Sequence, residues 1–124
     1  MTQPLALVLY EKLLPGSQLV NRLQDLNYRV QTLADPAALV GCAEQAKPMV
    51  VLVDLEPAQN KVCEAVSRLK QNSATQHLPV IAVCGENAAD LQKAARAAGV
   101  ALVVNEAAIL GHLEHFLEQA LHLD

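Results

Sequence analysis

Four short apolar runs and one segment that alternates apolar and polar residues recur along the chain, and an amphipathic or helix-like segment follows each of them. Runs of four to six apolar residues are typical of strands that are buried on both faces of a sheet. Apolar residues spaced three or four positions apart are typical of helices that cover such a sheet. The predicted strands are 5–10, 29–33, 49–54, 79–84 and 100–104, and the predicted helices are 15–26, 35–47, 61–71, 90–98 and 108–123.

Strict alternation of strands and helices predicts a parallel sheet with helices on both faces, because the crossover connections are right-handed. With five strands, the expected strand order is 2-1-3-4-5, that of a flavodoxin-like (βα)5 three-layer sandwich. Residues 1–124 are expected to form one domain. The strand from 29 to 33 alternates apolar and polar residues and is expected at an edge. Asp35-Pro36 is a predicted helix start, and Gly99 a predicted helix end.

Composition excludes several classes of function. Hydrophobic residues make up 52% of the chain, so it can form a core, whereas aromatic residues make up only 2% and offer no platform for stacking bases. The net charge is −4 and no basic cluster is present, which argues against a nucleic-acid partner. We expect no signal peptide and no membrane span. Three widely spaced cysteines, Cys42, Cys63 and Cys84, favour reduced thiols and a cytoplasmic location.

Ligands of such sheets bind outside the carboxyl ends of the strands. The residues at these ends are therefore the candidate functional residues: Tyr10-Glu11, Asp54-Leu55-Glu56, Cys84-Gly85 and Asn105-Glu106. The sequence has neither G-x-G-x-x-G nor a Walker A sequence, so nucleotide binding is not expected. The histidines of the last helix, His112, His115 and His122, lie near Glu118 and Gln119 without the spacing of a zinc motif, and a solvated polar face is the favoured interpretation.

Along nearly its whole length the chain resembles the receiver domains of two-component response regulators, the CheY-like family. The segment 75–84 (TQHLPVIAVC) is similar to the stretch that leads into the fourth strand of that family, and Ala97-Ala98-Gly99 is similar to the turn before its fifth strand. The spacings agree as well, with 43 positions from Glu11 to Asp54 and 30 from Asp54 to Cys84.

The resemblance implies a phosphorylation site. Asp54 matches the aspartate that accepts a phosphoryl group, and Glu11 matches the second of two acidic residues that help to bind Mg²⁺. A metal site would comprise Glu11, Asp54 and the backbone carbonyl of Glu56, with Mg²⁺ allowed for but no cofactor required. Oxygen ligands and a hard cation are suited to neutralising a transferred phosphoryl group.

Several positions depart from the family pattern. Tyr10 stands where the first acidic residue is expected, and Cys84 where a threonine or serine would bond the phosphoryl group. Asn105 replaces the lysine that would pair with it, and Glu106 replaces the proline that usually follows. Leu102 occupies the position that is often an aromatic switch residue. Asparagine donates a hydrogen bond but carries no charge, and a thiol is a weaker donor than a hydroxyl.

These departures favour a degenerate receiver, or pseudo-receiver, that acts by protein–protein interaction without regulated phosphorylation. We do not expect an enzyme, apart from at most self-catalysed phosphoryl transfer to Asp54. Two alternatives stay open: an atypical but working receiver that is phosphorylated at Asp54 with Mg²⁺ in a phosphorelay, and a flavodoxin-like small-ligand binding domain. The resemblance implies a histidine kinase or a downstream effector as partner. It also implies a homodimer contact through the fourth helix, fifth strand and fifth helix, where histidines would make association sensitive to pH.

Overall fold

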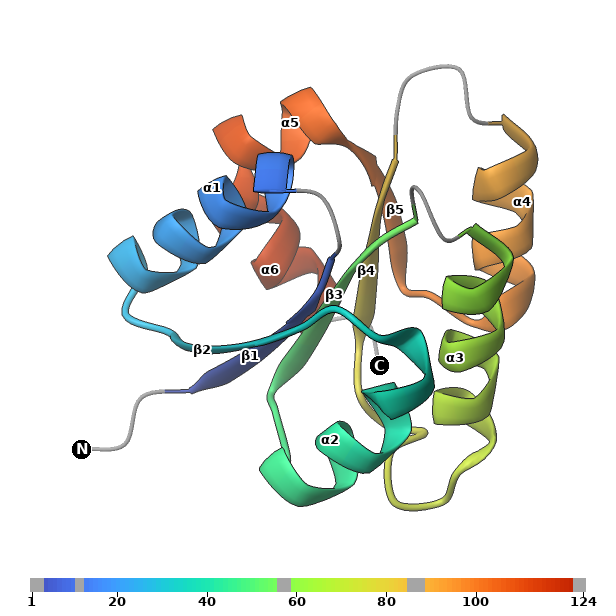
Figure 1. Ribbon diagram of the computed structural model, residues 1–124. Coiled ribbons are helices and arrows are strands. Elements are labelled where there is room, and N and C mark those ends of the chain that lie inside the picture. Colours follow the sequence, from blue (N-terminus) through green and yellow to red (C-terminus); the bar gives the residue numbers. More distant parts are fainter. Residues whose placement is uncertain (1–3, 11–12, 56–58, 85–88, 122–124) are drawn as a thin grey trace.

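A computed structural model of the chain shows three layers, with a five-stranded sheet between two layers of helices (Figure 1). The structure describes residues 4–10, 13–55, 59–84 and 89–121. All neighbouring strands are parallel, and their order is β2-β1-β3-β4-β5, which confirms the predicted fold. The strands are β1 (Leu5–Leu9), β2 (Arg29–Leu33), β3 (Val50–Asp54), β4 (Val80–Cys84) and β5 (Leu102–Asn105).

The helices fall into two groups, one on each face of the sheet (Figure 1). One face is covered by α1, α5 and α6, and the other by α2, α3 and α4. Their bounds are α1 (Leu13–Asp25), α2 (Leu39–Ala46), α3 (Gln59–Gln71), α4 (Ala89–Ala98), α5 (Glu106–Gly111) and α6 (Leu113–Leu121), and a 3₁₀ helix, η1 (Pro36–Ala38), precedes α2. Three of these helices, α1, α3 and α5, begin two residues before the predicted start. In α1 this places Pro15 in the first turn, where a missing N–H costs no helical hydrogen bond.

The sheet divides the core into two halves. Every residue of β3 and β4 is buried, because helices cover both faces of these central strands. Leu52 and Ile81 pack with Leu19 and Ile109 under α1, α5 and α6. On the other face, side chains such as Leu39 and Leu69 pack beneath α2, α3 and α4. By contrast β2 lies at the edge of the sheet and is mostly exposed, as its alternating sequence predicted.

Two predicted helix boundaries are visible in the backbone. Asp35 accepts a hydrogen bond through Oδ1 from the amide of Ala37 at 3.0 Å, which caps the turn that becomes η1. Gly99 follows α4 with a positive φ of 109°, and its amide bonds back to the carbonyl of Ala95 at 3.2 Å. These local signals fix where the chain leaves one helix and where it enters another.

The prediction of one continuous final helix over residues 108–123 is wrong for the described residues. The helical segment begins at Glu106, directly after β5, and is interrupted at His112 between α5 and α6. Gly111 lies at the interruption, and glycine disfavours a helix interior because of its backbone entropy. The apolar spacing continues through the interruption, which is why the sequence pattern alone predicts a single helix.

Replacing Gly111 with alanine is expected to stabilise the protein by up to about 1 kcal/mol. A Cβ at this position would have nothing within 4 Å, and Gly111 is not among the described residues with positive φ, so the substitution costs neither a clash nor strain. Urea unfolding followed by circular dichroism tests this expectation. A loss of stability would show that the interruption is required by the tertiary structure.

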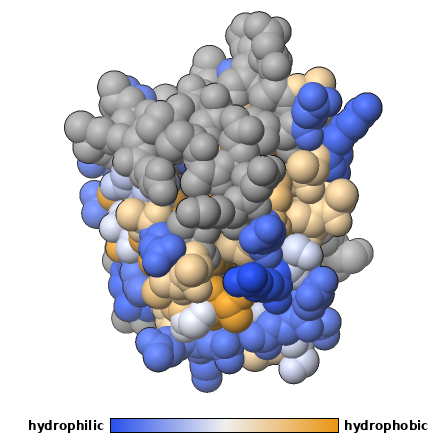
Figure 2. Space-filling model, turned by 45° about the vertical axis from the view of Figure 1, so that its right-hand side comes forward, coloured by the Kyte–Doolittle hydropathy of each residue, from blue (hydrophilic) through white to orange (hydrophobic). Residues whose placement is uncertain are grey.

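The surface over α3 and α4 is mixed in character. In Figure 2, which turns this side of the molecule forward, blue hydrophilic residues alternate with weakly hydrophobic ones. Within the parts of the chain that the structure describes, no helix has both the length and the apolar character needed to cross a membrane.

Candidate functional site

The carboxyl ends of the strands form the upper edge of the sheet in Figure 1, and the strand register places four of the predicted site residues there. Asp54 ends β3 and pairs with Val83 of β4. One position further along β4, Cys84 pairs with Asn105 of β5. Tyr10 directly follows β1, and its amide donates to the carbonyl of Leu33 at 2.9 Å.

Asp54 is the buried carboxylate of this edge. It is only 3% exposed, although an acidic side chain is rarely buried without compensating interactions. It follows the alternation of Val50 and Leu52, which face α1, α5 and α6. Asp54 takes part in interactions within the protein, while its Oδ2 atom accepts no hydrogen bond from the described residues. A buried carboxylate oxygen of this kind suits a nucleophile or a ligand for a hard cation.

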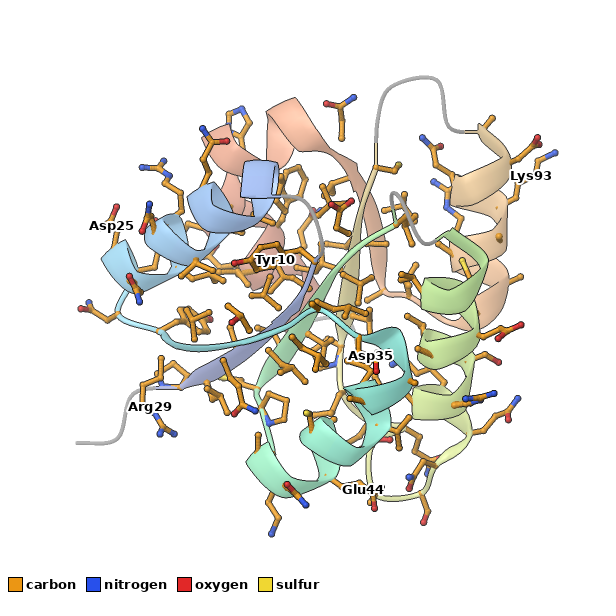
Figure 3. The ribbon with its side chains drawn as sticks, viewed as in Figure 1. Tyr10, Asp25, Arg29, Asp35, Glu44 and Lys93 are labelled. Atoms are coloured by element: carbon orange, nitrogen blue, oxygen red, sulfur yellow. The ribbon has the colours of Figure 1, made fainter. Side chains whose placement is uncertain are left out.

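Tyr10 packs against the hydrophobic core. It is half-buried and packs against the apolar residues beneath α1, α5 and α6, on the same side of the sheet as Ala6 and Val8. Figure 3 shows it between α1 and the sheet. A tyrosine with its ring among apolar residues contributes to packing, and it places no carboxylate at the position where the resemblance expects the first acidic residue.

Cys84 is fully buried on the opposite side of the sheet, among residues that pack under α3 and α4. Its sulfur accepts a hydrogen bond from Nε2 of Gln92, in α4, at 3.8 Å. Asn105 beside it is half-buried and makes contacts of its own. Leu102 begins β5, where it is half-buried and packs against the other half of the core.

For three other predicted site residues, Glu11, Glu56 and Glu106, the structure gives little information about the site. Glu11 and Glu56, two of the three proposed metal ligands, lie outside the described residues. Glu106 is the first residue of α5. Within the described part of the chain, no three histidine, cysteine or acidic side chains come together as a metal-binding group. Asp54 fits a magnesium ion by its chemistry, and it would hold the ion through a carboxylate oxygen; the rest of the ligand set stays a prediction.

The cysteines should differ in reactivity. Cys84 is fully buried, whereas Cys42 and Cys63 are half-buried, so a thiol reagent should label Cys42 and Cys63 in the folded protein and Cys84 only after unfolding. Burial raises the pKa of the Cys63 thiol, so its labelling rate should keep rising with pH beyond the range in which an ordinary thiol is ionised. Peptide mass mapping after timed labelling measures both. Early labelling of Cys84 would contradict the described packing.

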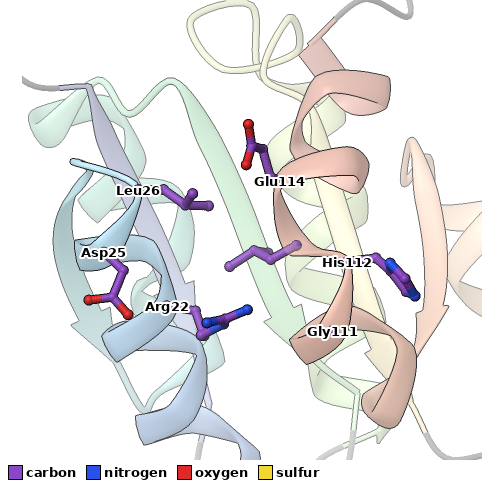
Figure 4. A pocket seen from close by; sticks show the side chains of 7 residues that line it. Arg22, Asp25, Leu26, Gly111, His112 and Glu114 are labelled. Atoms are coloured by element: carbon purple, nitrogen blue, oxygen red, sulfur yellow. The ribbon is translucent and has the colours of Figure 1, made fainter.

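A pocket of about 150 Å³ lies away from this edge, between the end of α1 and the interruption that separates α5 from α6 (Figure 4). Leu26 projects into the gap and Arg22 points towards Gly111, whereas His112 points away from α1. The sequence pattern does not reveal this pocket, because the pocket depends on the helix interruption. The full lining is Arg22, Asp25, Leu26, Gly111, His112, Leu113 and Glu114.

The described polar residues of α6 and of the turn before it are exposed, as predicted for a solvated face. They are His112, Glu114, His115, Glu118 and Gln119, while His122 lies outside the described residues.

No protein-family model matches the chain, and no curated protein sequence matches it. Solved structures do. A response regulator from Chloroflexus aurantiacus matches with a TM-score of 0.88 and 15% identity, over 97% of this chain and 98% of that one. The chain has the receiver-domain fold. The receiver domain of a sensor histidine kinase from Pseudomonas aeruginosa, described with a magnesium ion in its active-site cleft, matches with a TM-score of 0.86 and 18% identity over 97% and 98% of the two chains.

A third receiver fold, the response regulator domain of Thermotoga maritima CheB, matches over 99% of both chains with a TM-score of 0.80 and 19% identity. Identities below 20% leave the chemistry of the site to be argued from its own residues.

Proposed function

We propose that the chain is a receiver-type signalling module that acts through protein–protein contacts and does not use regulated phosphorylation as its switch. The observation that carries this proposal is the pairing of Cys84 with Asn105 at the carboxyl ends of β4 and β5. Both residues stand where the family resemblance expects groups that hold a phosphoryl oxygen. A thiol turned into the core and a neutral amide supply neither a hydroxyl nor a positive charge.

The same residues weaken the transfer step itself. In a working site a carboxylate oxygen of Asp54 would attack phosphorus, forming an acyl phosphate while the donor's leaving group departs. Stabilising the developing charge requires fixed donors and cations around the phosphoryl oxygens. Asn105 provides no cation and Tyr10 no metal-binding carboxylate, so an acyl phosphate would be poorly stabilised. The proposed partners are a histidine kinase or a downstream effector protein.

The burial of Asp54 at the end of β3 supports a second candidate, an atypical receiver that is phosphorylated with Mg²⁺. The nucleophile is present at the expected strand end, and magnesium would be held through its carboxylate. In this alternative Glu11 and the backbone carbonyl of Glu56, both outside the described residues, would complete the ligand set.

Beryllofluoride separates the two candidates. The protein is titrated with Mg²⁺ and beryllofluoride while amide NMR shifts near Asp54 are followed, with Asp54→Asn as the control. We expect no saturable shift that depends on Asp54. A second variant, Asn105→Lys, restores the missing cation and is expected to bind beryllofluoride more tightly than the natural chain. Saturable shifts in the natural chain that disappear in Asp54→Asn would overturn the pseudo-receiver proposal.

A further inference from the structure

A side-chain contact joins the end of β4 to the first turns of α4. Nε2 of Gln92 donates to Sγ of Cys84 at 3.8 Å, across eight positions of sequence. The sulfur end of this contact is fully buried, and Gln92 itself is half-buried. The contact therefore ties a site position to a helix whose outer face is available to other proteins.

Gln92 is the inward-facing polar side chain of this part of α4. Of the side chains that the structure describes between 89 and 94, Gln92 alone is not exposed. Figure 3 shows its neighbour Lys93 pointing outward from the helix. The inner contacts that are described further along α4 come from small side chains, Ala95 and Ala98, which bury little apolar area.

Sulfur is a weak hydrogen-bond acceptor, so this hydrogen bond contributes to stability mainly because it is buried. Water cannot reach Sγ of Cys84 to replace the amide, because the residue is 0% exposed. In such surroundings a hydrogen bond is electrostatically stronger than in water, and a lost partner is not readily compensated. The pair is thus suited to setting the position of α4 relative to β4.

We propose that Gln92 is a positioning residue. It couples α4 to Cys84 and so keeps the outer face of α4 in one fixed position relative to β4. The consequence for signalling rests on the proposed function, since a module without a phosphorylation switch must present its contact surface permanently. The exposed face of α4 carries Asp90, Lys93 and Arg96, charges of both signs that a partner with complementary charges would meet.

Hydrogen exchange of the α4 amides tests the coupling. Gln92→Met keeps the length of the side chain and removes its donor, and Lys93→Met makes the same replacement at the exposed neighbour. We expect amide exchange within 89–98 to become about fivefold faster in Gln92→Met. Lys93→Met should leave it unchanged, and α3 should be unaffected in both. Equal acceleration in α3 and α4 would reduce Gln92 to a contributor to global stability and overturn the proposal.

A double-mutant cycle isolates the pair. In a Cys84→Ala background, which lacks the acceptor, Gln92→Met should have no additional effect on α4 exchange, and Cys84→Ser, which keeps an acceptor, should behave close to the natural chain. Additive effects would overturn the coupling. These assays contain no Mg²⁺ or phosphodonor, so the beryllofluoride response is a separate readout. Binding of beryllofluoride at Asp54 would remove the proposed function and leave the coupling standing.

Discussion

Replacing Leu52 with alanine is expected to lower the free energy of unfolding by about 3–5 kcal/mol. Leu52 lies in the central strand β3, is fully buried, and pairs with Val8 on one side and Ile81 on the other. The sheet is held between two helical layers, so the neighbours of Leu52 cannot easily collapse into the cavity left by truncation. Equilibrium unfolding in urea, followed by circular dichroism, measures the change.

Met49→Ala serves as the matched control for that measurement. Met49 immediately precedes β3 but is 47% exposed, so its truncation should cost less than about 1 kcal/mol. Equal losses for the two variants would mean that Leu52 is not packed as described.

Replacing Gly99 with alanine is expected to cost about 2–3 kcal/mol. Gly99 has a φ of 109°, which side chains disfavour, and an added Cβ would lie 2.9 Å from Cγ of Lys70. Lys70 has little freedom to withdraw, because its Nζ donates to the carbonyl of Leu78. Thermal and urea unfolding report the loss. Gly41→Ala is the control: Gly41 lies exposed in α2 with nothing within 4 Å of an added Cβ, so this change should stabilise the protein by about 0.5–1 kcal/mol.

A second substitution divides the Gly99 effect into its two causes. In Lys70→Ala the interfering Cγ is gone, so adding Gly99→Ala to that background should cost only the backbone strain. The coupling between the two positions is then the steric part of the effect. If Gly99→Ala lowers the free energy of unfolding equally in both backgrounds, the contact with Lys70 contributes nothing to the effect. The strained φ alone then explains the sensitivity of this position.

The fold was predictable because its signals are local and repeated. Continuous apolar runs mark β3 and β4, which are buried on both faces, and the alternating run from Arg29 to Leu33 marks the edge strand. Asp35 begins a helical turn by accepting a hydrogen bond through its side chain, and Gly99 ends a helix because its backbone tolerates a positive φ. Each of these inferences needs only a few neighbouring residues, and no knowledge of the tertiary contacts.

Features that depend on contacts between distant segments were not predictable. The interruption near Gly111 does not disturb the apolar spacing on either side, so no pattern reveals it. The partner of Cys84 is another example, because only the packing of α4 on β4 brings Gln92 to it. Tyr10 could have been assigned to the core from its two-residue spacing with Ala6 and Val8, a signal that the comparison with an acidic position obscured.

The wholly parallel sheet has a consequence for how the chain folds. β1 lies between β2 and β3, so Ala6 pairs with Val30 on one side and with Val50 on the other. No two neighbouring strands are joined by a tight turn, and each pairing must close a loop that contains a whole helix before it forms its first hydrogen bond. Helices can therefore form early while the sheet assembles late, through contacts of high sequence separation. During that interval the central strand β3, which is buried along its whole length in the folded protein, must pair with β1 and β4 to avoid pairing with another chain.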